Sequence, residues 1–162
     1  TGGNYAASLL AQGEGYEHGC SQVMFLDAET ATHIEELGGM NLFFVYKDGH
    51  VATPSLDGTI LRGITRDSVC TLIRDRGINL EERKITLDEV RAGINSGEIV
   101  EVFACGTAAV ITPIGQFKSR EEIIGDANAE PGALTASLRE ELTGIQYGKV
   151  ADRHNWLVKL SD

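Results

Sequence analysis

The apolar residues of this chain fall into short runs, and this feature most constrains its fold. The longest runs, such as Leu42-Phe43-Phe44-Val45-Tyr46, have the length of a strand and are far too short to span a bilayer. Elsewhere apolar residues recur at helical spacing, as at Leu134, Leu138 and Leu142. Strand and helix patterns alternate along the chain, which predicts a single α/β or α+β domain with a mixed sheet.

The expected elements follow from these patterns and from the residues that begin or end helices. We expect helices over residues 6–18, 66–76 and 131–145, and a short helix that Thr86 caps. Thr65 is expected to cap the helix that starts at residue 66, and Gly77 to end it. We expect strands over residues 22–27, 40–46, 51–53, 80–85, 98–105 and 108–114.

Composition narrows the classes of function. The formal net charge of −10 over 162 residues argues against nucleic acid or an anionic membrane as a partner. Cys20, Cys70 and Cys105 form no C-x-x-C pair, and the four histidines show no metal-binding spacing. We therefore expect no disulfide framework and no metal site, and a reducing cytoplasm fits best. An acidic chain can still bind a phosphate through backbone N–H groups.

Two glycine-containing loops could hold an anion. The segment Leu61-Arg62-Gly63-Ile64-Thr65 leads into a helix, whose first N–H groups and dipole favour a phosphate. The segment Cys105-Gly106-Thr107-Ala108-Ala109 follows a strand, and its glycine lets the backbone approach a ligand closely. Each loop alone is more often an ordinary junction or turn that binds nothing. The presence of both in one short chain is more informative than either.

Glu36 is a candidate for a different contact. It lies between a polar run and the apolar run that begins at Met40, in the segment 34–41. A carboxylate at such an edge could accept a hydrogen bond from a protonated ring nitrogen. The alternative is that Glu35 and Glu36 are a solvated pair, which is the commoner fate of adjacent glutamates.

Several motifs together resemble one family. The matching segments occur in the family's order, and they are residues 2–5, 36–43, 53–58, 63–68, 82–85, 101–109 and 144–148. They resemble the branched-chain aminotransferases of fold type IV, which use pyridoxal 5′-phosphate and have the D-amino-acid-aminotransferase-like fold. The last segment, Gly144-Ile145-Gln146-Tyr147-Gly148, resembles the branched-chain enzymes more than their D-amino-acid relatives. The resemblance implies a C-terminal cofactor-binding domain over residues 1–162, with a mixed sheet or pseudo-barrel and surrounding helices.

The resemblance implies roles for individual residues at the cofactor ring. Tyr5 would donate a hydrogen bond to the phenolic oxygen of the cofactor. Glu36 would pair with the pyridine nitrogen and keep it protonated, so that the ring accepts electrons. Leu61 would pack against the ring. Tyr5 and Glu36 are therefore the expected catalytic side chains.

The resemblance also implies how the phosphate and the substrate are bound. The residues expected around the phosphate belong to the two glycine loops and are Gly63, Ile64, Thr65, Gly106 and Thr107. The backbone amides of Thr107 and Ala108 would bind the carboxylate of the substrate. The implied reaction transfers the amino group of leucine, isoleucine or valine to 2-oxoglutarate, which gives 2-oxo acids and glutamate, and the implied assembly is a homodimer.

Two departures from the family pattern qualify these expectations. Relatives usually carry proline where this chain has Arg62. The Schiff-base lysine of the family would stand one position before Thr1, and the N-terminal domain would also be absent, so we expect the isolated chain to fold without transaminating. Two alternatives stay open. One is another fold-type IV enzyme, such as a D-amino-acid transaminase or aminodeoxychorismate lyase, and the other is a non-catalytic dimerisation or binding domain.

Overall fold

The computed structural model describes residues 6–57 and 59–160. Most of its strands form one seven-stranded sheet, in which every pair is antiparallel except the parallel pair β4 and β5. The expected mixed sheet is therefore confirmed. Its strands are β1 (Met24–Leu26), β2 (Ile34–Leu37), β3 (Met40–Tyr46), β4 (Val51–Pro54), β5 (Leu80–Arg83), β6 (Ile99–Gly106) and β7 (Val110–Pro113).

Strand β3 is the centre of this sheet. Its residues 41–46 pair with β6 on one side. On the other side its first residues pair with β2 and its last residues pair with β4. A separate hairpin is formed by β8 (Gln116–Lys118) and β9 (Ile123–Gly125). The strand β2 and this hairpin were not expected from the sequence.

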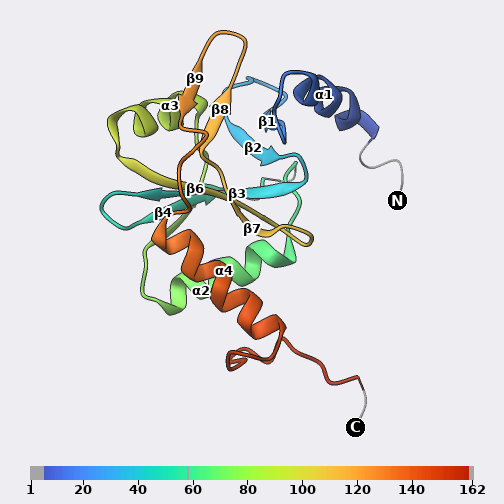
Figure 1. Ribbon diagram of the computed structural model, residues 1–162, viewed down its shortest axis with the longest axis vertical. Coiled ribbons are helices and arrows are strands. Elements are labelled where there is room, and N and C mark those ends of the chain that lie inside the picture. The colour runs from blue at the N-terminus through green and yellow to red at the C-terminus, as the bar shows by residue number, and fades with distance from the viewer. Residues whose placement is uncertain (1–5, 58, 161–162) are drawn as a thin grey trace.

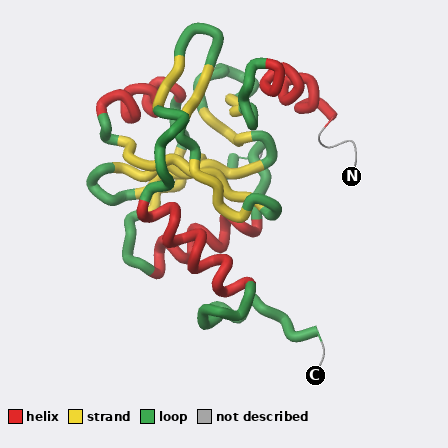
Figure 2. The backbone as a smooth tube through the Cα atoms, in the orientation of Figure 1, coloured by secondary structure: helices red, strands yellow, loops and turns green. Residues whose placement is uncertain are grey.

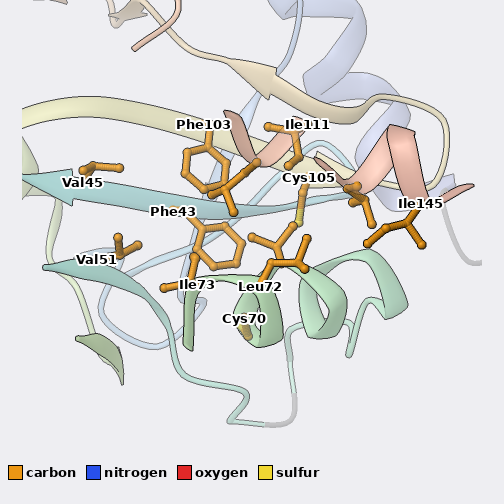
Figure 3. Close-up of a cluster of buried hydrophobic side chains, with 13 residues drawn as sticks. Phe43, Val45, Val51, Cys70, Leu72, Ile73, Phe103, Cys105, Ile111 and Ile145 are labelled. Atoms are coloured by element: carbon orange, nitrogen blue, oxygen red, sulfur yellow. The ribbon is translucent and has the colours of Figure 1, made fainter. Parts of the chain in front are cut away.

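Helices cover both faces of the sheet (Figure 1, Figure 2). On one face lie α2 (Ile64–Asp75) and α4 (Ala133–Gln146), and on the other lies α3 (Leu87–Ser96). The cores follow from the alternation of side chains along each strand. The core beneath α2 and α4 includes Phe43 and Phe103, whose rings stack with centroids 4.9 Å apart (Figure 3).

The helix α1 (Ala6–Glu17) confirms the expected helix over residues 6–18, but it buries no residue in this fold. Leu9 and Leu10 are 66% and 75% exposed. Figure 1 shows α1 at one side of the molecule, beside β1 and β2. Within the part of the chain that the structure describes, no helix is long and apolar enough to cross a membrane.

The start of α2 differs from the expectation. The helix begins at Ile64, and the residue before it, Gly63, has an extended backbone and supplies no side-chain cap. Thr65 therefore lies inside the first turn and is not the N-cap. The expectation was wrong because a glycine, which can occupy an N-cap position without a capping side chain, directly precedes a residue that is already helical.

Candidate functional site

Three loops meet at the beginning of β3. Asn41 pairs across the sheet with Glu36 on β2 and with Cys105 on β6. The turn between β2 and β3 and the turn between β6 and β7 therefore lie side by side at this edge. The loop that precedes α2 joins them, because the Asn41 side chain donates a hydrogen bond from Nδ2 to the Leu61 carbonyl oxygen, at 3.1 Å.

A cavity of about 710 Å³ opens between α1, β1, β2 and the loop before α2. This volume lies in the range of small-molecule and cofactor sites. Polar carboxylates, glycines and apolar side chains share its wall. The residues that line it are Ala7, Ser8, Phe25, Leu26, Glu35, Glu36, Gly38, Gly39, Thr59, Ile60, Leu61 and Arg62.

Glu36 is a partly buried carboxylate in this wall. Burial raises its pKa above the ordinary value, and the nearby Glu35 carboxylate adds to this, while a hydrogen bond from the Leu61 N–H opposes it. Among the described residues, the Leu61 N–H is the one hydrogen-bond donor that the structure places on the Glu36 side chain. A cationic N–H group in the cavity would stabilise the charged carboxylate and lower its pKa.

The N-terminus of α2 follows this loop directly. The first N–H groups of an α-helix, here those of Ile64 and Thr65, have no partner within the helix, and the N-cap residue Gly63 makes no side-chain capping hydrogen bond. Gly63 packs against the amide oxygen of Asn41 so closely that a Cβ atom there would collide with it. The Ile64 side chain is 82% exposed, so it does not anchor the turn by burial.

The second glycine loop is the turn between β6 and β7. Thr107 and Ala108 are exposed at its tip, and Gly106 is the last residue of β6. A Cβ atom at Gly106 would lie 3.0 Å from Cγ of Met40, which ties this turn to the start of β3. After the turn, Val110 has a φ of 56°, an uncommon conformation for a β-branched residue.

The structure brings together only part of the predicted site. Glu36 and Leu61 line the same cavity. The predicted phosphate and carboxylate residues do not line it within the described part of the chain; they are Gly63, Ile64, Thr65, Gly106, Thr107 and Ala108. They lie in the two turns that border the start of β3. Tyr5 falls outside the described residues.

Sequence reasoning missed Asn41. It is 6% exposed and joins the strand that carries Glu36 to the loop that carries Leu61. The signal was present, because Asn41 is a single amide at the start of an apolar run, between Met40 and Leu42. Buried amides of this kind are usually retained for the hydrogen bonds they make.

Comparison with known proteins places these features in a family. The sequence profile described as "Amino-transferase class IV" matches residues 2–117. The branched-chain-amino-acid aminotransferase of Mycolicibacterium smegmatis is 52% identical over 163 residues, covering 99% of this chain and 44% of that protein. The chain therefore spans less than half the length of this relative.

Solved structures agree with the sequence match. The branched-chain amino acid aminotransferase from Escherichia coli superposes with a TM-score of 0.83 at 32% identity, over 99% of this chain and 50% of that chain. The enzyme from Thermobaculum terrenum, solved in its pyridoxal-phosphate form, gives a TM-score of 0.78 at 35% identity, over 96% and 47%. Since the family profile covers more than half of the residues, the chain belongs to the class IV aminotransferase family.

Proposed function

We propose that this chain forms the C-terminal, cofactor-binding part of a branched-chain-amino-acid aminotransferase that uses pyridoxal 5′-phosphate. One observation carries the proposal: the Glu36 carboxylate and Leu61 line one cavity, and the loop that carries Leu61 and Arg62 leads along the chain into the N-terminus of α2. The similarity to branched-chain aminotransferases supports the substrate class. The proposal includes the finer fold description, a D-amino-acid-aminotransferase-like domain with a pseudo-barrel.

The residues present fit the two ends of this cofactor. A protonated pyridine nitrogen needs a carboxylate that is fixed in place and partly shielded from water. Glu36 is partly buried, and the Leu61 N–H donates a hydrogen bond to it. A phosphate needs N–H donors at a helix N-terminus, and α2 offers them beside a glycine. The cavity wall also contains Gly39, an exposed residue without a side chain, so its backbone is accessible to a ligand.

The bound cofactor would supply an electron-accepting ring that stabilises negative charge at the α-carbon of the substrate. Glu36 would hold a proton on the pyridine nitrogen, which strengthens that acceptor. The N–H groups of Ile64 and Thr65, with the Thr107 hydroxyl, would bind the phosphate. The amides of Thr107 and Ala108 would orient the carboxylate of the amino acid. Tyr5 would donate to the phenolic oxygen.

The covalent attachment of the cofactor is proposed to depend on a lysine outside these residues. None of the lysines in the described part of the chain lines the cavity. A segment of these 162 residues alone is therefore expected not to transaminate, because covalent catalysis would lack its amine nucleophile. Homodimerisation and a cytoplasmic location belong to the same proposal and rest on the family resemblance.

The test is a transamination assay on the product of the complete gene. We expect pyridoxal-phosphate-dependent transfer from leucine, isoleucine and valine to 2-oxoglutarate, with little or none from D-alanine. The same assay on residues 1–162 alone is expected to show no transfer. Equal activity with D-alanine would favour a D-amino-acid transaminase, and failure of the complete product to bind pyridoxal phosphate would contradict the proposed function.

A further inference from the structure

A buried amide in an apolar strand needs a reason to be there. Asn41 is 6% exposed and stands at the start of β3, where the following residues are apolar and buried. Burying an amide without hydrogen bonds is costly. The Asn41 side chain recovers this cost by donating from Nδ2 to the carbonyl oxygen of Leu61, twenty residues further along the chain. Asn41 is therefore retained for its contact with the loop.

Leu61 is held from both sides of its backbone. Its N–H group donates to the Glu36 carboxylate, and its carbonyl oxygen accepts from Asn41. Glu36 and Asn41 are direct partners in the antiparallel pair of β2 and β3, so their side chains stand on the same face of the sheet. Two paired strand positions thus clamp one residue of the loop.

This clamp lies between the two ends of the proposed ligand site. Glu36 stands at the ring end, and Leu61 lies two residues before Gly63, the residue that directly precedes α2. Gly63 itself packs against the amide oxygen of Asn41. The Asn41 amide therefore touches the loop at Leu61 and at Gly63, and it sets where the helix N-terminus lies relative to Glu36.

We propose that Asn41 is a positioning residue, which fixes the distance between the ring-nitrogen partner Glu36 and the phosphate-binding N-terminus of α2 by holding the Leu61 carbonyl. The inference rests on the proposed function and adds a residue to it. Asn41 makes no contact with the cofactor in this account. Loss of its amide leaves Glu36 and the N-terminus of α2 present but changes the distance between them.

The test compares two variants of the complete gene product, each of which loses one buried hydrogen bond from a side chain to the backbone. Asn41→Leu removes the amide that donates to the Leu61 carbonyl oxygen. Thr53→Val removes a hydroxyl in the same sheet that donates to the Leu42 carbonyl oxygen, at 2.7 Å. Binding of pyridoxamine 5′-phosphate and of pyridoxamine is measured by calorimetry, because neither ligand needs a covalent bond. Thermal unfolding is recorded for both proteins.

We expect Asn41→Leu to weaken binding of pyridoxamine 5′-phosphate by about tenfold, the effect of roughly one good hydrogen bond, and to weaken pyridoxamine less. Thr53→Val should lower the melting temperature to a similar extent while both affinities stay at the wild-type level. If Asn41→Leu does not fold, Asn41→Ser takes its place, since a serine hydroxyl is too short to reach Leu61 and adds no apolar bulk.

Two results overturn the inference. Wild-type affinity for pyridoxamine 5′-phosphate in the Asn41 variants is one, and an equal loss for both ligands in step with the melting temperature is the other. Either result leaves the proposed function standing as long as the wild-type protein binds pyridoxamine 5′-phosphate. If the wild-type protein binds neither ligand, the proposed function is wrong and the role of Asn41 is wrong with it.

Discussion

At the scale of single residues, the site holds a carboxylate at a cost to the fold. Burial raises the pKa of Glu36, which means that the folded protein binds a proton there more tightly than the unfolded chain does. The folded state therefore loses stability as the pH rises from the ordinary value through the raised pKa. Residues that serve a ligand commonly impose such a cost on the ligand-free protein.

This cost gives a prediction for Glu36→Gln in the cofactor-free protein. Glutamine keeps an oxygen that can accept from the Leu61 N–H but carries no charge, so the variant should be more stable than wild type at neutral pH. The difference should shrink as the pH falls below the ordinary pKa of glutamate, where both proteins are neutral at this position. Urea unfolding of both proteins at several pH values, from about pH 4 to about pH 8, measures this difference in stability. A difference that stays constant with pH would contradict the assignment of the shift to this carboxylate.

At the scale of elements, α4 is capped by a residue from a distant strand. The Glu101 carboxylate on β6 accepts from the backbone N–H groups of Leu134 and Thr135 and from the Thr135 hydroxyl, at 3.1, 2.8 and 2.7 Å. The helix has no side-chain cap on Gly132, and a Cβ atom there would collide with Glu101. The strand and the helix therefore stabilise each other at this point.

We predict that Glu101→Ala lowers the free energy of unfolding by about 1–2 kcal/mol, since it removes a charged cap and leaves helix N–H groups without partners. The matched control is Glu98→Ala, which removes an exposed carboxylate just before the same strand and should change stability by less than about 0.5 kcal/mol. Chemical denaturation of both variants measures the difference. Equal effects would show that Glu101 does not cap α4.

Most of the helices and strands could be predicted from the sequence, and the exceptions have a physical reason. The strands β3 and β6 and the helices α2, α3 and α4 were predicted because their own apolar residues repeat with the right period. β2 was missed because Glu35 and Glu36 interrupt its apolar pattern, and it becomes a strand by pairing with β3. The cap of α4 comes from a residue 33 positions away, which no local pattern reveals.

At the scale of the molecule, two residues that the sequence analysis expected near one ligand do share a cavity wall, but how that wall is assembled was not predicted. Glu36 and Leu61 were both expected near a cofactor ring, and they do line one cavity. Their hydrogen bond, and the amide that holds Leu61 from its other side, depend on how β2, β3 and the loop before α2 pack. Packing of segments that are distant in sequence is what a pattern of single residues does not encode.

The three cysteines differ in their exposure to solvent. Cys70 and Cys105 are 2% and 0% exposed, and burial raises their pKa values to about 11 and about 12. Both thiols therefore stay protonated and unreactive at neutral pH. We predict that a thiol reagent modifies the partly exposed Cys20 first and the other two only when the protein unfolds. Mass spectrometry after timed labelling tests this, and fast labelling of Cys105 in the native protein would contradict the packing described.

Turnover of the Glu36→Gln variant tests whether Glu36 is the partner of the cofactor's ring nitrogen, as proposed. The control is Glu35→Gln, which neutralises the adjacent carboxylate that instead accepts from the Thr59 hydroxyl at 2.6 Å. In the complete gene product, with leucine and 2-oxoglutarate, we expect Glu36→Gln to lose about a hundredfold or more in kcat, because a neutral amide does not hold a protonated ring. Glu35→Gln should lose far less. A wild-type kcat for Glu36→Gln, or an equal loss in both variants, would contradict the account.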